Sequence, residues 1–365
     1  MSASITKWSV YPSNEEAWQA MLADCAAAEK SIVVEQFIFN DDEFGRKLID
    51  VCALRAAAGV DVRFLWDAAG SFTFWGTNIA AELRAKGIKL VFWRTLIPSY
   101  FKMPDIRSWF WRDHRRTLVV DSSIAYTGSL CVKDAYRNWR DINARFEGPV
   151  AADMQNAFER MWAKATDRQP HQPKPNSRDH EFRYVTNEPT PGRRKLYREL
   201  VEAIRGAKTY VYLTTPYFVP TRRLNRVIKL AAHRGIDVRI IMPERTDHYP
   251  TLDLGARSFF TTLLDSGVRI FLYPNKDGSS LIHGKAAVID GEWATLGSLN
   301  LDHVSLLYNY EANIISTNSR LAEELEAQFI HDMKHCREVT AAAWHERLWL
   351  EKLPEIAIRL VRKFL

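Results

Sequence analysis

The strongest chemical signal in the sequence is a pattern of three residues that occurs twice. In each copy a histidine is followed two positions later by a basic residue and, five positions after that, by an aspartate: His114, Arg116 and Asp121, then His283, Lys285 and Asp290. Positions i and i+2 of an extended strand face the same side, so the imidazole and the cation could contact one phosphate together. A phosphodiester needs cations on its oxygens, a nucleophile and an acid for the leaving oxygen, and imidazoles and cations can supply these.

Small polar residues follow each copy. Ser129 comes after Gly128 in the first, and Ser298 comes after Gly297 in the second, where Asn300 is added. These side chains could donate hydrogen bonds to phosphoryl oxygens. Small polar residues also collect in turns after glycine, so a structural role stays open for them.

Both copies belong to a longer internal repeat. Five segments recur in the same order, in the pairs 31–39 with 209–218, 55–66 with 229–243, 81–93 with 261–273, 114–121 with 283–290, and 126–130 with 295–300. The segments alternate between β-branched runs and helical runs that end at glycine, which predicts strand, helix and strand in turn. Such alternation favours mostly parallel sheets covered by helices. The expected fold class is therefore α/β, in two duplicated units.

The segment 168–194 separates the repeats. It carries five prolines and little apolar periodicity, which predicts a connection over the surface. We place the boundary near residue 175, with an N-terminal half over 1–175 and a C-terminal half over 176–340. An amphipathic, basic tail over 341–365 follows.

Composition limits the class of protein. The chain has 365 residues, of which 47% are hydrophobic, enough for two ordinary domains. We expect a cytoplasmic protein, because no apolar run approaches the ~18 residues of a membrane span and the first residues lack a signal-peptide pattern. Its 4 cysteines are scattered without CxxC spacing, which predicts neither disulfides nor a zinc cluster. The net charge of +6 favours an anionic partner, either membrane phosphates or nucleic acid.

At the two histidine motifs the chain resembles the phospholipase D superfamily, whose duplicated motif is His-x-Lys-x4-Asp followed by Gly-Ser and Asn. The resemblance covers about residues 29 to 335 and is greatest to the bacterial cardiolipin synthases. The segments that carry it are 114–121, 139–150, 215–220, 234–248, 283–302 and 309–316. It implies a pseudo-twofold molecule in which two mixed or parallel sheets, flanked by helices, share one active site.

The resemblance also implies a two-step transfer that needs neither a metal nor another cofactor. One histidine attacks phosphorus to form a phosphohistidine, and the other protonates the leaving alcohol and then activates the acceptor. By this resemblance His114 attacks and His283 serves as acid and base, while Arg116 and Lys285 bind the phosphoryl oxygens. Ser129, Ser298 and Asn300 would add hydrogen bonds to the substrate.

Carboxylates are expected to orient the imidazoles. Within the motifs, Asp121 and Asp290 take this role. Glu311 matches an acidic position that the family has near the second histidine, and Asp141 is its counterpart in the first half. Glu311 and Asp141 could equally be plain salt-bridge partners.

The first half departs from the family pattern. Arg116 replaces the usual lysine, which keeps the charge but changes the geometry of phosphate binding. Cys131 stands where an asparagine is common, and the segment 301–305 of the second half lacks an arginine that commonly precedes the serine. A weakened or specialised first half is therefore one reading of the sequence.

Two segments indicate contact with an anionic membrane. Residues 92–116 carry seven aromatic and six basic side chains, and residues 344–365 place apolar side chains at helical spacing beside several cations. Aromatic side chains that pack under a long loop, or a tail that docks on its own domain, would give similar patterns.

The function predicted first is a phosphatidyltransferase that acts on phospholipids, with phosphatidylglycerol as acceptor and cardiolipin as product, peripherally associated with the inner face of the cell membrane. The same residues with water as acceptor would give a phospholipase D or a nuclease. A partner nucleic acid is not expected, because stacking aromatics would then line an open basic groove rather than one insertion and the tail. A non-catalytic module that binds anionic lipid is the third alternative, and retention of both histidines argues against it.

Overall fold

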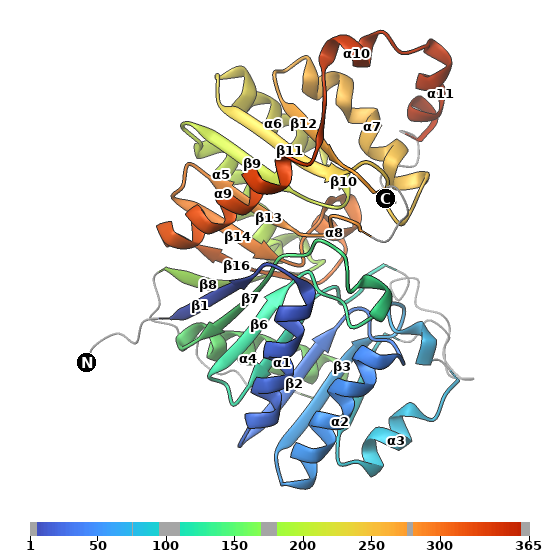
Figure 1. Cartoon of the computed structure of the whole chain (residues 1–365), viewed down its shortest axis with the longest axis vertical. Coiled ribbons are helices and arrows are strands. Elements are labelled where there is room, and N and C mark those ends of the chain that lie inside the picture. Colours follow the sequence, from blue (N-terminus) through green and yellow to red (C-terminus); the bar gives the residue numbers. More distant parts are fainter. Residues whose placement is uncertain (1–5, 75, 95–109, 169–180, 276–279, 359–365) are drawn as a thin grey trace.

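The computed structural model describes residues 6–74, 76–94, 110–168, 181–275 and 280–358. Figure 1 shows two α/β halves stacked along the long axis, with the N-terminal half in blue to green and the C-terminal half in light green through yellow to red. The two halves follow the order of the sequence repeat, and the predicted α/β class is confirmed.

The N-terminal half is built on a seven-stranded sheet in the order β1-β7-β6-β5-β2-β3-β4. Its elements are β1 (Lys7–Tyr11), α1 (Asn14–Ala27), β2 (Ser31–Gln36), α2 (Glu43–Ala57), β3 (Asp61–Asp67), α3 (Ile79–Ala85), β4 (Lys89–Trp93), β5 (Thr117–Val120), β6 (Ile124–Gly128), β7 (Asn143–Glu147) and α4 (Pro149–Ala165). Helices α1, α2 and α3 pack on one face of the sheet, and α4 packs on the other.

The C-terminal half is built on an eight-stranded sheet in the order β17-β12-β11-β9-β13-β14-β16-β8. Its elements are β8 (Phe182–Asn187), α5 (Lys195–Gly206), β9 (Tyr210–Thr214), β10 (Phe218–Val219), α6 (Arg222–His233), β11 (Asp237–Pro243), α7 (Thr251–Leu264), β12 (Arg269–Tyr273), β13 (Ala286–Ile289), β14 (Trp293–Gly297), β15 (Leu301–Asp302), α8 (His303–Leu307), β16 (Glu311–Ser316), α9 (Ser319–Met333), β17 (Arg337–Val339), α10 (Ala341–His345) and α11 (Trp349–Ile358). Helices α5, α6 and α7 cover one face and α9 the other.

Both sheets are mixed, so the expectation of mostly parallel sheets is wrong for part of each half. Strands β2, β3 and β4 are parallel, as are β9, β11 and β12, because helices connect them. From β5 and β13 onward the neighbours are antiparallel. The connection between β5 and β6 is only residues 121–123, which is too short for the crossover that parallel strands require.

The predicted surface connection over 168–194 contains a strand. Residues 182–187 form β8, which pairs antiparallel with β16 at the edge of the second sheet. An edge strand gains its stability from backbone hydrogen bonds to its neighbour, and its short alternating pattern was hidden among prolines and charges. The remaining residues 169–180 lie outside the described part of the chain.

The two halves share one apolar cluster. It contains Phe146 of β7 and Ile142 just before that strand, together with Leu296 of β14 and Ile314 of β16. Burial of side chains from both sheets in one cluster fixes the halves against each other. Segments that reach this junction from either half are therefore held at defined positions.

The two segments predicted to contact a membrane are only partly described. Residues 95–109 and 359–365 lie outside the described part of the chain. The tail before residue 359 folds as α10 and α11, which lie against α7 (Figure 1). Within the described residues, the helices are all too short or too polar to cross a membrane.

Candidate active site

Backbone hydrogen bonds tie each histidine segment to the opposite half. The His114 amide donates to the carbonyl of Tyr310 at 2.9 Å, and the His283 amide donates to the carbonyl of Arg140 at 2.9 Å. The histidines precede β5 and β13 in their own sheets, so each lies where its sheet meets the other. The structure thereby brings the two motifs of the repeat together at the junction of the halves.

The His114 imidazole lies between a carboxylate and a guanidinium. Its Nδ1 is 2.9 Å from Oε1 of Glu311, and its Nε2 is 3.1 Å from Nη2 of Arg116. A guanidinium can only donate, so Nε2 accepts and the proton of the neutral ring is on Nδ1, where it is donated to Glu311. This tautomer leaves the lone pair of Nε2 directed at the group that would bind phosphate.

The His283 imidazole has a matching carboxylate. Its Nδ1 is 2.7 Å from Oδ1 of Asp141, and Oδ2 of Asp141 accepts from Nδ2 of Asn14 at 2.7 Å. Asn14 is the first residue of α1 and also donates to the carbonyl of Trp139 at 3.2 Å. Asp141 is thus held from both sides, and it holds the ring of His283 in turn.

The carboxylates are paired across the halves, which corrects one expectation. Glu311 was expected near the second histidine, yet it contacts His114, and Asp141 of the first half contacts His283. The cause is the backbone exchange described above, since each carboxylate follows directly on the segment that binds the opposite histidine. Each imidazole is therefore oriented by the half to which it does not belong.

Asp121 and Asp290 do not orient the histidines, so that prediction is wrong. Asp121 accepts from the amides of residues 29–31 at 2.7 to 2.9 Å, at the start of β2. Asp290 accepts from the amides of residues 208–210 at 2.8 to 3.0 Å, at the start of β9. Both have a positive φ, 52° and 56°, which turns the carboxylate back toward these strands. They stabilise strand ends at a distance from the chemistry.

Two buried cations accompany the imidazoles. Lys285 is 1% exposed and its Nζ donates to the carbonyl of His283 at 2.7 Å. Arg116 donates through Nη1 to the carbonyl of His114 at 2.9 Å and through Nε to Sγ of Cys131 at 3.3 Å. The thiol that replaces the usual asparagine therefore supports the arginine that replaces the usual lysine.

The imidazoles are kept neutral by their surroundings. Burial, followed by the charges of Arg116 and Lys285, holds the pKa of His114 well below its usual range. Burial and Lys285 lower the pKa of His283 to about 4. Burial and Arg116 lower the pKa of Lys285 itself to about 7. The two histidines and the two cations thus act on one another as members of a single site.

The two carboxylates differ in charge state. Burial raises the pKa of Glu311 to about 8, although hydrogen bonds from Ser298 and Ser305 oppose the rise. Burial also acts against ionisation of Asp141, but the charge and hydrogen bond of His283 hold the pKa of Asp141 below its usual range. Asp141 is therefore more fully ionised than Glu311, and the His283 ring has the more negative carboxylate beside it.

The small polar residues lie behind the imidazoles. Ser298 donates to Glu311, and Ser129 accepts from the amide of Ile142 at 3.0 Å, so both support the carboxylate segments. The side-chain oxygen of Asn300 is buried without a hydrogen-bond partner among the described residues. Contact of Ser129, Ser298 and Asn300 with substrate stays a prediction.

Sequence reasoning did not find two of the residues that hold the carboxylates. Ser305 donates to Oε1 of Glu311 at 2.7 Å and accepts from the amide of Asn300 at 2.8 Å. Asn14 lies more than a hundred residues before the carboxylate that it contacts. Ser305 stands in the 301–305 segment, where the family pattern marks a serine, whereas nothing in the sequence around Asn14 points to the site.

Aromatic rings enclose the imidazoles. The ring of Phe37 lies edge-on to His114 with centroids 4.7 Å apart. Trp139 and Tyr217 lie at 4.9 and 6.4 Å from the His283 ring. Such walls limit access of water to the reacting groups, which strengthens the electrostatic interactions inside.

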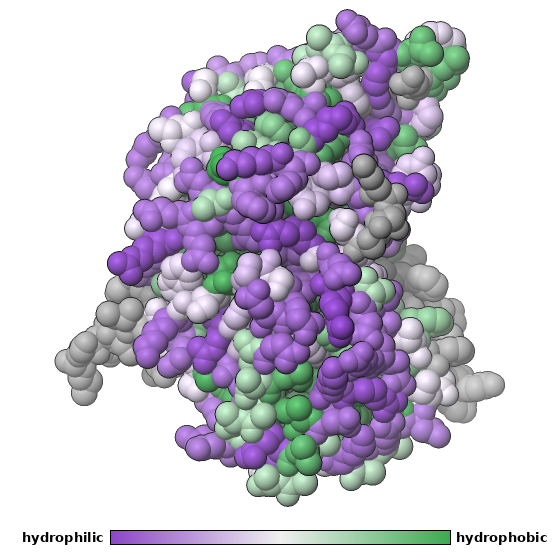
Figure 2. Space-filling view, in the orientation of Figure 1, coloured by the Kyte–Doolittle hydropathy of each residue, from purple (hydrophilic) through white to green (hydrophobic). Residues whose placement is uncertain are grey.

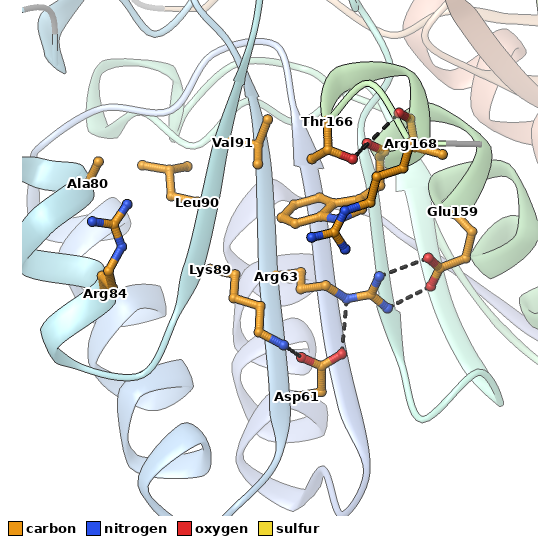
Figure 3. A pocket seen from close by; sticks show the side chains of 12 residues that line it. Asp61, Arg63, Ala80, Arg84, Lys89, Leu90, Val91, Glu159, Thr166 and Arg168 are labelled. Carbon is orange, nitrogen blue, oxygen red and sulfur yellow. Dashed lines mark hydrogen bonds and ion pairs between the residues drawn. The ribbon is translucent and has the colours of Figure 1, made fainter. Parts of the chain in front are cut away.

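A cavity of about 600 Å³ lies elsewhere, between the β4 edge of the first sheet and α4. Figure 3 shows Arg63 there, bound to Glu159 by two hydrogen bonds and to Asp61 by an ion pair of 3.0 Å, while Lys89 binds Asp61 at 2.7 Å. The residues that line it, all of them described, include neither a histidine nor a cysteine. The cavity is therefore separate from the histidine site.

Comparison with curated proteins finds relatives along nearly the whole chain. Cardiolipin synthase A of Pseudomonas syringae pv. syringae is 30% identical, over 96% of this chain and 73% of the relative. The cardiolipin synthase of Clostridium perfringens SM101 is 29% identical, over 94% of this chain and 74% of the relative.

Comparison with solved structures finds the same architecture. Phosphatidylserine synthase of Haemophilus influenzae Rd KW20 has a TM-score of 0.76 at 17% identity, covering 98% of this chain and 95% of that one. Polyphosphate kinase of Porphyromonas gingivalis has a TM-score of 0.63 at 10% identity, covering 99% of this chain and 53% of that one. At these identities the likeness concerns the fold.

A duplicated α/β unit whose halves each bring a histidine and a cation to one site defines a phospholipase D-like enzyme. The family model described as "Cardiolipin synthase, PLD-like domain" matches residues 21–162 and 200–333, and the chain belongs to this family. It is an enzyme of the phosphatidyltransferase type in phospholipid biosynthesis.

Proposed function

We propose that this enzyme moves a phosphatidyl group from one phospholipid to a hydroxyl of phosphatidylglycerol, which gives cardiolipin, through a phosphohistidine intermediate. The observation that carries the proposal is the crossed pairing of the imidazoles, His114 with Glu311 and His283 with Asp141, around the buried cations Arg116 and Lys285. In both rings Nδ1 faces a carboxylate, which leaves Nε2 as the nitrogen for chemistry, and on His114 this nitrogen is freed when a phosphoryl oxygen takes over the hydrogen bond from Arg116.

In the first step Nε2 of His114 attacks phosphorus. Arg116 lies 3.1 Å from this nitrogen, so a phosphoryl oxygen bound to the guanidinium holds the phosphorus beside the nucleophile. The nitrogen–phosphorus bond forms as the bond from phosphorus to the leaving alcohol breaks. The negative phosphodiester and Asp141 favour uptake of a proton by Nε2 of His283 when substrate binds, and this proton passes to the alcohol oxygen as it leaves. Glu311 accepts the Nδ1 proton of His114 in a hydrogen bond that strengthens as positive charge develops on that ring.

In the second step the acceptor hydroxyl gives its proton to His283 and its oxygen attacks phosphorus. The nitrogen–phosphorus bond breaks, and His114 returns to its starting state. Exclusion of water by Phe37, Trp139 and Tyr217 favours an alcohol as acceptor.

The two roles are assigned from the different surroundings of the rings. Asp141 is the more ionised carboxylate and favours the protonated state of His283, as an acid requires. The pKa of His283 is about 4 without substrate, and the negative charge of a bound phosphodiester raises it. Arg116 donates to Nε2 of His114 and so disfavours its protonation, which keeps His114 a nucleophile.

The experiment is to offer the purified enzyme phosphatidylglycerol vesicles, mixed phospholipid vesicles and single-stranded DNA separately and to identify products by mass spectrometry. Cardiolipin with free glycerol supports the proposal. Phosphatidic acid as the main product would make the enzyme a hydrolase, and shortened oligonucleotide would make it a nuclease. Full activity in a His283→Ala variant would rule out the mechanism.

The proposal includes peripheral association with the anionic inner face of the cell membrane. The described part of the tail exposes Trp349 by 67%, next to the exposed Leu348, Leu350 and Leu353. Figure 2 shows hydrophobic side chains gathered at this corner, over α10 and α11. Amphipathic aromatic and apolar side chains of this kind suit the headgroup level of a bilayer.

Flotation with phosphatidylglycerol vesicles tests this association. Replacing Trp349 and Leu353 together by serine should lower the bound fraction several-fold. Leu54 is also exposed and belongs to α2, which lies in the opposite half of the molecule from α11 (Figure 1), so Leu54→Ser is the matched control and should bind as the unaltered enzyme does. An equal fall of the bound fraction in both variants, or no fall in either, would contradict α11 as the segment that contacts the membrane.

A further inference from the structure

A hydrogen bond beside His283 joins two polar groups, the hydroxyl of Tyr217 and the carboxylate of Asp247, that the mechanism given above does not use. Tyr217 connects β9 to β10, is 9% exposed, and meets the His283 ring at an interplanar angle of 70°. Its hydroxyl donates to Oδ1 of Asp247 at 2.7 Å. Asp247 follows β11, so the pair lies beyond the carboxyl ends of two parallel strands, where open α/β sheets bind ligands.

Among the residues that the structure describes, no hydrogen-bond donor contacts Oδ2 of Asp247. Its side chain is 28% exposed, and the shortest approach of His248 is 3.8 Å from Nε2 to Oδ2, beyond hydrogen-bond range. An ionised carboxylate can accept up to four hydrogen bonds. The carboxylate is thus reachable and able to bind hydroxyl groups.

The loop that carries Asp247 is fixed in place. The amide and hydroxyl of Thr246 bind the carboxylate of Asp253 at 3.0 and 2.6 Å, and Asn275 donates to the carbonyl of Arg245 at 2.9 Å. A binding group held by its neighbours in this way loses little entropy when a ligand arrives.

A second phenol lies next to the pair. Tyr136 stacks on Trp139 with ring centroids 3.5 Å apart, and its hydroxyl accepts from Nζ of Lys133 at 3.3 Å. Burial, then the charges of Cys131 and Asp247, raises the pKa of Tyr136, which places this phenol within the reach of the Asp247 charge. Two phenols and a carboxylate therefore converge beside His283.

In the described part of the first half, no matching pair is found next to His114. There the aromatic neighbour of the histidine is Phe37, which has no hydroxyl. Asp67, at the end of the neighbouring strand β3, is buried against Arg112 at 2.7 Å. Within the described ranges the aromatic neighbours of the two histidines thus differ: a phenylalanine without a hydroxyl meets His114, and a tyrosine hydroxyl bound to a carboxylate lies beside His283.

We propose that Tyr217 and Asp247, with Tyr136 beside them, form the subsite for the acceptor and select an alcohol whose reacting hydroxyl stands next to a second hydroxyl, such as a glycerol headgroup. This inference rests on the proposed function, because it assigns the acceptor to the side of His283. When one hydroxyl of a vicinal diol gives its proton to His283, the other reaches the carboxylate of Asp247. A site built to bind a hydroxyl rejects analogues that lack it, because its polar groups are then left without partners.

A competition experiment tests the subsite. The whole enzyme is given phosphatidylglycerol vesicles with equal concentrations of deuterated glycerol and 1-propanol, which lacks the second hydroxyl. Mass spectrometry gives the ratio of deuterated phosphatidylglycerol to phosphatidylpropanol. The unaltered enzyme should favour glycerol, and Asp247→Asn and Tyr217→Phe should each lower the ratio by about tenfold, as expected for loss of a hydrogen bond to a charged group.

Tyr212→Phe is the matched control. Tyr212 lies in β9, and its hydroxyl also donates to an aspartate. That aspartate is Asp237, 3.2 Å away at the start of β11 rather than beyond its end. Its ratio should equal that of the unaltered enzyme.

Each outcome decides one point. An unchanged ratio in both Asp247→Asn and Tyr217→Phe, or an equal fall in Tyr212→Phe, would overturn the subsite while transfer itself continues. If the unaltered enzyme forms only phosphatidic acid with both alcohols present, the proposed transfer fails and the acceptor subsite fails with it.

Discussion

Replacing Asp141 by asparagine tests whether this carboxylate orients the general acid and base. In the structure Asp141 accepts from two donors, Nδ1 of His283 at 2.7 Å and Nδ2 of Asn14 at 2.7 Å. An asparagine has one acceptor oxygen, so in either orientation its amide group faces a donor. If the amide faces His283, the ring proton moves to Nε2 and that nitrogen can no longer accept a proton.

The size of the effect follows from the loss of one charge-assisted hydrogen bond. Such a bond contributes about 1.5–3 kcal/mol. If that energy is lost from the transition state, kcat/KM falls about 10- to 100-fold. The unfolding temperature should change little, because the side chain keeps its volume and one of its hydrogen bonds.

Asp290→Asn is the matched comparison. Asp290 belongs to the histidine motif by spacing, but it binds the amides at the start of β9 and has no hydrogen bond to either histidine among the described residues. Asparagine tolerates the positive φ of 56° at this position. This variant should unfold a few degrees lower and keep kcat/KM close to that of the unaltered enzyme.

The assay is transfer activity against phosphatidylglycerol concentration, with the unfolding temperature measured on the same samples by calorimetry. A loss of activity in Asp290→Asn without a change in unfolding temperature would refute the assignment. Unaltered kcat/KM in Asp141→Asn would refute it as well.

Two further variants probe the same site. The pKa of Lys285 is lowered to about 7, so kcat/KM should fall as the pH rises through that value and the ammonium loses its charge. The Lys285→Arg variant stays charged and should move this fall to higher pH. A pH profile that does not move would exclude Lys285 as the source of the fall. Asn14→Ala removes the donor on Asp141 and should lower kcat about three- to tenfold with KM nearly unchanged; a rise in KM alone would show that Asn14 acts on substrate binding instead.

The repeat and the catalytic pairs were predictable because their signals are local. A histidine and a cation two positions apart face one side of an extended segment wherever that segment lies, so His114 with Arg116 and His283 with Lys285 could be found by spacing. Helices α2, α3, α6 and α7 end shortly before glycines with positive φ, 92° at Gly59, for the same local reason.

The partners of the histidines were not predictable in the same way. Glu311 and Asp141 lie 197 and 142 positions from the rings that they contact, and the docking of the two halves decides which ring each one meets. Spacing could place Asp121 just after a strand, but only the backbone dihedral shows that its carboxylate turns back to β2.

Some elements were missed because their stability comes from neighbours. The strand β8 was hidden in a proline-rich segment and exists through its pairing with β16. The contact of Asn14 with Asp141 depends on where α1 packs against the first sheet, and the residues around Asn14 do not predict that position.

Trapping the covalent intermediate tests the central claim most directly. The enzyme is mixed with phosphatidylglycerol, quenched at alkaline pH to preserve phosphoramidates, digested, and mapped by mass spectrometry. We predict an acid-labile phosphatidyl adduct on His114 that is absent from His114→Ala. An adduct on His283 would reverse the two roles, and cardiolipin formation without an adduct on either histidine would contradict the double displacement itself.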